Sequence, residues 1–158
     1  MSIHFEEISE GDEYTSTPRT IEAADITKFA QLSGDFNPLH VDPEWVRANT
    51  SFDDCIAHGL LMLAITSGLP TAGLDDWLIE AYLNVERRMV TPTYPGDTVH
   101  AKSVVSSTRR SSSRPGTGIV RVDVTLHNQR GEIVQSGVDT YLVKARVSEA
   151  PADSPQSP

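Results

Sequence analysis

Residues 57–69 read AHGLLMLAITSGL, a segment that as a helix would be apolar on almost every face. Such a helix is enclosed by the rest of its protein instead of lying on the surface. It is too short and too polar to cross a membrane, because a span needs about 20 apolar residues. Gly68 and Pro70 are residues that end helices. The other elements of the chain must therefore pack around this one segment.

The second half of the chain has the alternation of apolar and polar residues that is typical of half-buried strands. The alternation is clearest over residues 118–127 and less strict over residues 78–89, 98–106 and 133–143. Parallel strands would need long crossovers, and the links between these segments are short. The pattern therefore predicts an antiparallel sheet.

Helical patterns occupy the first half of the chain. Residues 20–34 have helical spacing that Gly34 would end, and Asp42-Pro43 opens a short helix through about Ala48. The fold class that follows is α+β, with a curved antiparallel sheet around one buried helix.

The length of 158 residues suits a single domain, which we assign to residues 1–146. Residues 147–158 are rich in Pro, Ser and Ala and have no apolar periodicity, so we predict a disordered tail there. The single cysteine, Cys55, cannot form an internal disulfide, and the acidic N-terminus does not resemble a signal peptide. These features predict a cytoplasmic protein.

The formal net charge of −9 is unevenly distributed. Residues 1–60 contain 12 acidic and 3 basic residues, whereas residues 109–158 contain 5 acidic and 7 basic ones. The overall excess repels phosphate backbones and anionic lipid, so we expect neither nucleic acid nor a membrane as a partner. Arg109, Arg110 and Arg114 leave room for a small phosphorylated ligand, because guanidinium groups suit phosphate. The alternative is that they are solvated loop charges.

The segment Ser33–His40, SGDFNPLH, places Asp35, Asn37 and His40 between two predicted helices. Pro38 biases Asn37 away from helical backbone. A carboxylate and an imidazole held in this way could share one water molecule, one group taking its proton and the other orienting it. The alternative is that Asp35 and Asn37 only form a turn, as both residue types commonly do.

His58 and Gly59 stand at the start of the predicted buried helix. Unpaired N–H groups and a positive dipole end lie there, and glycine lets a ligand approach the backbone. Gly59 could therefore form an oxyanion hole, or it could be needed only for close packing. We expect a capping or packing role for His58 and a buried thiol for Cys55, since a cysteine nucleophile needs a nearby base.

The segments FAQLSGDFNPLHVD and IAHGLLMLAI together resemble the hydratase-2 signature of MaoC-like (R)-specific enoyl-CoA hydratases. The resemblance extends over about residues 5–145. It implies the hot-dog fold, in which a curved antiparallel sheet wraps a long central helix. It also implies a homodimer or a dimer of dimers.

The resemblance assigns roles by position. Asp35 and His40 match the catalytic pair that would activate water for addition to C3 of a trans-2-enoyl thioester, with a proton delivered to C2. Asn37 matches the asparagine that supports the pair, and Gly59 matches the glycine whose N–H would hold the thioester oxygen. The implied substrate is an acyl-CoA or acyl-carrier-protein thioester, and the product an (R)-3-hydroxyacyl thioester. No metal or redox cofactor is implied.

Arg109, Arg110 and Arg114 become candidate contacts to the phosphates of CoA under this resemblance. Two other functions stay open. A hot-dog thioesterase would need a carboxylate on or facing the central helix, and residues 57–69 contain none. A non-catalytic acyl-thioester-binding protein or partner subunit is favoured by Ala64, at a position where we expect serine in many members.

Overall fold

The computed structural model describes residues 2–146, and the predicted tail at 147–158 lies outside the described residues. The elements follow the expected order, with helices mostly in the first half and long strands in the second. They are η1 (Phe5–Glu7), β1 (Glu13–Thr15), β2 (Arg19–Thr20), α1 (Ala23–Ser33), α2 (Pro38–Val41), α3 (Pro43–Asn49), α4 (Gly59–Ser67), η2 (Leu74–Asp76), β3 (Ile79–Met89), β4 (Thr98–Arg110), β5 (Thr117–Asn128) and β6 (Ile133–Lys144).

The strands form one antiparallel sheet in the order β1-β4-β5-β6-β3. The short β2 also pairs with β4, beside β1. The prediction of an antiparallel sheet from the alternating segments is confirmed. β3 is hydrogen-bonded only to β6 among the described strands, so its other edge is free. A free edge presents unpaired backbone N–H and C=O groups, which native proteins cover or pair.

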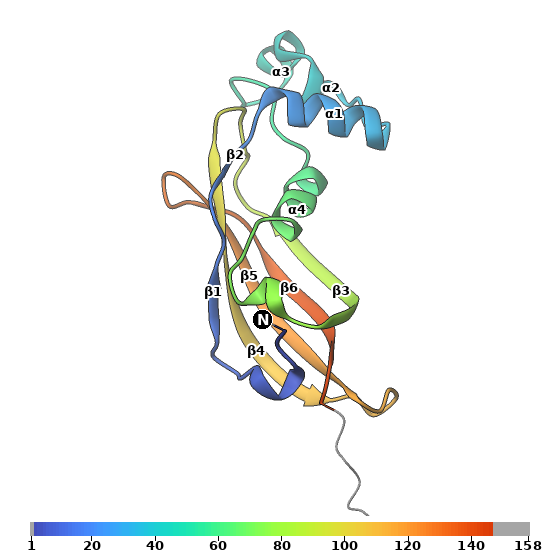
Figure 1. Ribbon diagram of the computed structural model, residues 1–158. Coiled ribbons are helices and arrows are strands. Elements are labelled where there is room, and N and C mark those ends of the chain that lie inside the picture. The colour runs from blue at the N-terminus through green and yellow to red at the C-terminus, as the bar shows by residue number, and fades with distance from the viewer. Residues whose placement is uncertain (1, 147–158) are drawn as a thin grey trace, which may run out of the picture.

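Helix α4 lies across one face of this sheet (Figure 1). It packs on Val99 and Ala101 of β4 and Leu126 of β5 through its own buried side chains, which are Leu61, Met62, Ile65 and Thr66. A second cluster, around Trp77 and the valines of β4 and β5, fills the rest of that face. The alternation in the sequence therefore correctly predicts the buried faces of β4 and β5. It is wrong for β3, where the apolar side chains Ile79, Leu83, Val85 and Met89 are exposed, because this strand lies at an edge of the sheet.

The structure changes two details of the predicted buried helix. It is shorter than residues 57–69, because His58 is the N-cap and Gly68 is the C-cap. It is also open on one side, where Leu60 is 63% exposed and Ala64 is exposed as well. The physical reason is that a single sheet covers one side of a helix. The remaining apolar side needs another cover.

Helices α1, α2 and α3 gather at one end of the sheet (Figure 1). The N-cap of α1 is Glu22, which forms a capping box with Asp25, and Gly34 ends the helix with a φ of 78°. Asp42 caps α3 by accepting hydrogen bonds from the N–H groups of Glu44 and Trp45, as the Asp-Pro pair predicts. Within residues 2–146, no helix is long and apolar enough to cross a membrane.

Asp97 fixes the turn that connects β3 to β4. Its Oδ2 accepts a hydrogen bond from the Tyr94 N–H at 2.9 Å, and its Oδ1 accepts from Gln129 Nε2 at 2.7 Å and Arg130 Nη1 at 3.0 Å. Burial by itself would raise the pKa of Asp97, but these donors hold it below the ordinary value of 3.8. The carboxylate therefore stabilises the folded state in its charged form.

Asp97→Asn is expected to lower the thermal midpoint at neutral pH, because an amide turns N–H groups toward at least one of these donors. A carboxyl with a lowered folded pKa adds stability above its unfolded pKa and loses it as pH falls through the folded one. The difference in midpoint between the two proteins should therefore be constant near neutrality and shrink below about pH 4. Asp123→Asn, at an exposed position on β5, is the control. A difference unchanged between pH 7 and pH 3 would contradict this role.

Candidate active site

The loop after α1 has the turn geometry that Asp and Asn favour. Asp35 Oδ1 accepts a hydrogen bond from the Asn37 N–H at 3.1 Å, and Asn37 Oδ1 accepts one from the Leu39 N–H at 3.0 Å. Asn37 is the N-cap of α2, with Pro38 at the first position of that helix. The turn interpretation is therefore correct, and the turn also fixes the helix that carries His40. Asn37 supports the site through this cap.

His40 lies on α2 and is half-buried. Its ring Nδ1 is 2.7 Å from the carbonyl oxygen of Ile56, in the segment that leads into α4. A carbonyl oxygen only accepts hydrogen bonds, so the Nδ1 of His40 carries the proton. The neutral ring then has a basic Nε2, which is the atom that could accept a proton from water.

Three side chains from separate parts of the fold meet here. A carboxylate oxygen of Asp35 and one ring nitrogen each of His40 and His58 all lie within 4.8 Å of one another. Asp35 is exposed, His40 is half-buried and His58 is buried. Two hydrogen bonds of about 2.8 Å each can be made by one water molecule between groups at this spacing. The arrangement suits activation of a water molecule by a carboxylate and an imidazole.

In the described part of the chain, Asp35, His40 and His58 are the only group of three His, Cys, Asp or Glu side chains close enough together to bind one metal ion. The imidazoles of His40 and His58 are stacked, with centroids 3.7 Å apart and planes inclined by 28°. The nitrogen lone pairs lie in the ring planes, so the lone pairs of stacked rings run side by side and do not converge on one point. This geometry favours proton transfer over metal binding.

Gly59 begins α4 beside these residues. Among the residues described, none accepts a hydrogen bond from its N–H, as expected for the first turn of a helix. A pocket of about 320 Å³ borders both Gly59 and His40. Its other walls are mostly apolar: Leu39, Phe52, Ile56, Ala57, Met62, Met89, Val90, Thr91, Pro92, Thr93, Val134 and Gln135. The pocket can take an apolar chain whose polar end meets the N–H of Gly59 and the ring of His40.

Gln135 of β6 and Met89 of β3 contact the start of α4. Gln135 is buried, and its Nε2 lies 2.7 Å from the carbonyl oxygen of Gly59 and 2.9 Å from Met89 Sδ. A Cβ on Gly59 would lie 3.0 Å from side-chain atoms of Met89. Glycine therefore gives the pocket room that an alanine would partly fill, so the close-packing interpretation of Gly59 is also correct.

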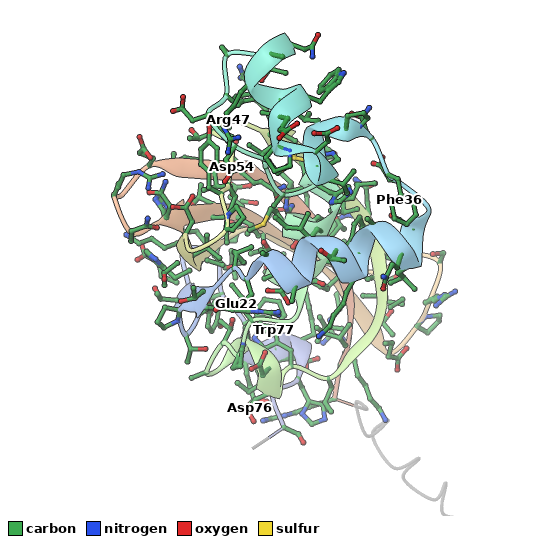
Figure 2. The ribbon with its side chains drawn as sticks, turned by 90° about the horizontal axis from the view of Figure 1, so that it is seen from above. Glu22, Phe36, Arg47, Asp54, Asp76 and Trp77 are labelled. Atoms are coloured by element: carbon green, nitrogen blue, oxygen red, sulfur yellow. The ribbon has the colours of Figure 1, made fainter. Side chains whose placement is uncertain are left out.

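A second pocket, of about 500 Å³, lies on another side of His40 and includes Phe36, Val41 and Cys55. Figure 2 shows Phe36 at the turn between α1 and α2, and Asp54 beside α3. Burial, with the Asp54 carboxylate as a smaller cause, raises the pKa of the Cys55 thiol. A thiol with a raised pKa is a poor nucleophile, which agrees with the expected buried, inert role.

Other predicted residues lie outside this cluster. Arg109 and Arg110 end β4 and Arg114 follows in the hairpin, at the end of the sheet opposite α1–α3 (Figure 1). Arg110 forms an ion pair with Glu6. Within one chain the structure therefore does not bring the three arginines to Asp35, and their contact with phosphate stays a prediction. Ala64 borders neither pocket that includes His40.

His58 and Gln135 also belong to this site, although the sequence did not predict either of them as a site residue. His58 occupies the N-cap position of α4 and packs there, but its side chain makes no capping hydrogen bond. The side chain instead contacts both members of the Asp35–His40 pair. Its position directly before Gly59 was a usable signal, because residues that flank a helix start share the surroundings of its N–H groups. Gln135 gave no signal, since its contacts depend on the register of β6 against β3.

Known proteins are similar to this chain in sequence and in architecture. A family model described as the MaoC like domain matches residues 5–128. The (R)-specific enoyl-CoA hydratase of Aeromonas caviae is 33% identical over 115 residues, covering 73% of this chain and 81% of that protein. The (R)-specific enoyl-CoA hydratase of Rhodospirillum rubrum is 33% identical over 153 residues, covering 90% of this chain and 93% of that protein.

A conserved hypothetical protein of Mycobacterium tuberculosis, described as a double hotdog fold, matches with a TM-score of 0.81 at 20% identity. The match covers 96% of this chain and 47% of that chain. At this identity the likeness concerns the fold alone, and it confirms the hot-dog fold that the sequence implies. The match to the family over residues 5–128, with these two relatives at 33% identity, shows that the chain belongs to the MaoC-like dehydratase family.

Proposed function

We propose that this protein catalyses the reversible addition of water to trans-2-enoyl thioesters, giving (R)-3-hydroxyacyl thioesters. The observation that carries the proposal is the position of the Asp35 carboxylate next to His40, a residue that lines an apolar pocket together with Gly59. Relatives named (R)-specific enoyl-CoA hydratase support the reaction and its stereochemistry. A CoA or acyl-carrier-protein thioester is the substrate. The lone, buried Cys55 suits the reducing cytoplasm.

In the proposed reaction, Asp35 orients a water molecule and Nε2 of His40 accepts one of its protons. The water oxygen forms a bond to C3, and the electron pair of the C2=C3 bond moves toward the thioester carbonyl. The N–H of Gly59 donates a hydrogen bond to the carbonyl oxygen as it gains negative charge. When the carbonyl forms again, C2 takes the proton back from His40. The second proton of water stays on the new hydroxyl, so the step balances without an oxidant or a reductant.

A panel of trans-2-enoyl-CoA substrates of increasing chain length tests this function. The expected result is loss of the absorbance of the conjugated enoyl thioester, without release of free thiol. The apolar walls of the pocket predict that activity changes with acyl chain length. Enoyl absorbance that stays constant with every CoA and carrier-protein substrate would contradict the proposal.

A thioesterase would release thiol in the same assay. The central helix, Gly59–Ser67, carries no carboxylate. Asp139, which borders the small cavity beneath Thr66 and Ser67, is bound to Arg87. A carboxylate held in a buried ion pair is not available to activate water, so the structure favours hydration.

We also propose that two copies of the chain associate through the open side of α4 and the free edge of β3. Seven of the thirteen large apolar side chains exposed in the described part of the chain lie on or next to these two elements. They are Leu60, Ile79, Tyr82, Leu83, Val85, Met89 and Val90. A patch of this kind marks an interaction site. The double hotdog fold of the Mycobacterium tuberculosis protein supports a paired arrangement.

The variant Leu60→Asp is expected to shift the solution mass from the dimer to the single chain. Leu60 is 63% exposed in one chain, so the substitution costs that chain little packing, whereas a covered interface would have to bury the new carboxylate unpaired. Val104→Asp, at an exposed position on the other face of β4, is the control. Light scattering that gives a dimer for both variants would contradict this interface.

A further inference from the structure

His58 is a buried side chain of the site, at 2% exposure. Its ring lies between two others: the His40 ring at a centroid distance of 3.7 Å and the Phe29 ring at 5.0 Å. Its Nε2 is 3.0 Å from the backbone carbonyl oxygen of Asp35. One buried side chain therefore contacts both the residue that carries the carboxylate and the imidazole.

The hydrogen bonds define the protonation of both rings. The partner of His58 Nε2 is a carbonyl oxygen, as is the partner of His40 Nδ1, and carbonyl oxygens only accept. His58 therefore donates from Nε2, and His40 donates from Nδ1. The second nitrogen of His58, Nδ1, is buried and has no hydrogen-bond partner within the described part of the chain.

Packing alone does not explain a histidine at this position. A buried nitrogen without a partner destabilises a fold, and an apolar ring of similar size would fill the same space between Phe29 and His40 without that cost. The part of His58 that an apolar ring cannot replace is the N–H that reaches the Asp35 carbonyl. That contact joins the start of α4 to the loop after α1, two segments whose side chains must meet for catalysis.

We infer that His58 is a positioning residue, which holds the Asp35 loop against the start of α4 through its Nε2–H and supports the His40 ring by stacking. The inference rests on the proposed hydration reaction. It adds to that reaction a residue that touches neither the water nor the thioester in the proposed step. A displacement of about 1 Å of a catalytic group can reduce a rate by about 100-fold, so the contact need not be strong to matter.

Two substitutions separate the hydrogen bond from the ring. His58→Phe keeps an aromatic ring against His40 and removes the N–H. His58→Gln removes the ring and keeps a donor, because the glutamine Nε2 is separated from Cβ by the same number of bonds as the histidine Nε2. His127→Gln is the control, since His127 is half-buried and stacks on His100 on the other face of the sheet, with centroids 5.5 Å apart.

Steady-state hydration of trans-2-butenoyl-CoA is the first readout. We expect His58→Phe to lower kcat about 100-fold, and His58→Gln to stay within about tenfold of the wild-type kcat. KM and the affinity for the unreactive butanoyl-CoA should change little in both, because His58 does not line the pocket. Wild-type kcat in His58→Phe, or equal losses in the two variants, would overturn the inference.

NMR gives a second readout that does not depend on activity. Nitrogen-15 shifts should show His58 protonated at Nε2 and His40 at Nδ1. The Phe36 amide, whose peptide group contains the Asp35 carbonyl, should shift in His58→Phe and stay near its wild-type position in His58→Gln. A His58 protonated at Nδ1, or an unmoved Phe36 amide, would overturn the inference. A wild-type protein without hydratase activity would instead overturn the proposed function, and the NMR result would still decide the role of His58.

Discussion

Asp35→Asn is expected to lower the rate of trans-2-butenoyl-CoA hydration about 10³-fold, since positioned acid–base groups contribute between about 10² and 10⁴. The amide oxygen of the new asparagine can still accept the hydrogen bond from the Asn37 N–H, so the turn is kept. The negative charge that orients the water beside His40 is lost. Because the carboxylate is exposed and touches no core residue, the thermal midpoint should stay within a few degrees of the wild type.

The matched control for this experiment is Asp123→Asn, which removes an equally exposed carboxylate from β5, far from α2 along the fold. It should hydrate the substrate at the wild-type rate. Binding of butanoyl-CoA should be similar in all three proteins, because the pocket walls do not include Asp35. A fully active Asp35→Asn protein would show that the carboxylate has no part in the reaction.

Asp139→Asn is expected to cause the largest loss of stability, about 3–5 kcal/mol in the free energy of unfolding. Asp139 Oδ2 accepts a hydrogen bond from Arg87 Nη2 at 2.8 Å, and Asp139 Oδ1 lies 2.6 Å from Arg87 Nη1 in the same ion pair. Both side chains are at most 5% exposed. Burial, and then the Asp139 charge, raises the pKa of Tyr141, which keeps its hydroxyl as a donor to Oδ2. Without the carboxylate, the buried guanidinium has no counter-charge.

Denaturant unfolding measures this loss, and two further variants show its cause. Arg87→Met combined with Asp139→Leu removes both charges and should recover most of the stability, because no unpaired charge is left in the interior. Asp25→Asn breaks the more exposed pair with Arg19, and should cost no more than about 1 kcal/mol. If Asp139→Asn and the wild-type protein have the same midpoint denaturant concentration, the Arg87–Asp139 ion pair between β3 and β6 does not stabilise the fold.

The fold is predictable from the sequence to the extent that burial is periodic. Alternation over residues 118–127 predicts the buried face of β5, and Asp42-Pro43 predicts the start of α3. The open side of α4 is not predictable in this way, because an apolar residue such as Leu60 looks the same whether its own sheet or a second chain covers it. The sequence shows how much apolar surface exists and does not show which chain buries it.

The candidate site is likewise only partly predictable from the sequence. Asp35, Asn37 and His40 are close in sequence and are joined by hydrogen bonds within one turn and one helix, so a short motif contains their geometry. His58 enters 18 residues after His40, by stacking and by a bond to a backbone oxygen, and neither contact requires a particular sequence spacing. Contacts of this kind can be recognised only in the folded structure.

The most direct test of the account is the product that the wild-type protein forms from trans-2-butenoyl-CoA in water labelled with oxygen-18. The account predicts (R)-3-hydroxybutanoyl-CoA with the label in the C3 hydroxyl, the thioester intact and formation about 10³-fold slower in Asp35→Asn. Label in a released carboxylic acid, with free CoA as the second product, would show thioester hydrolysis and contradict the account, as would formation of the (S)-alcohol.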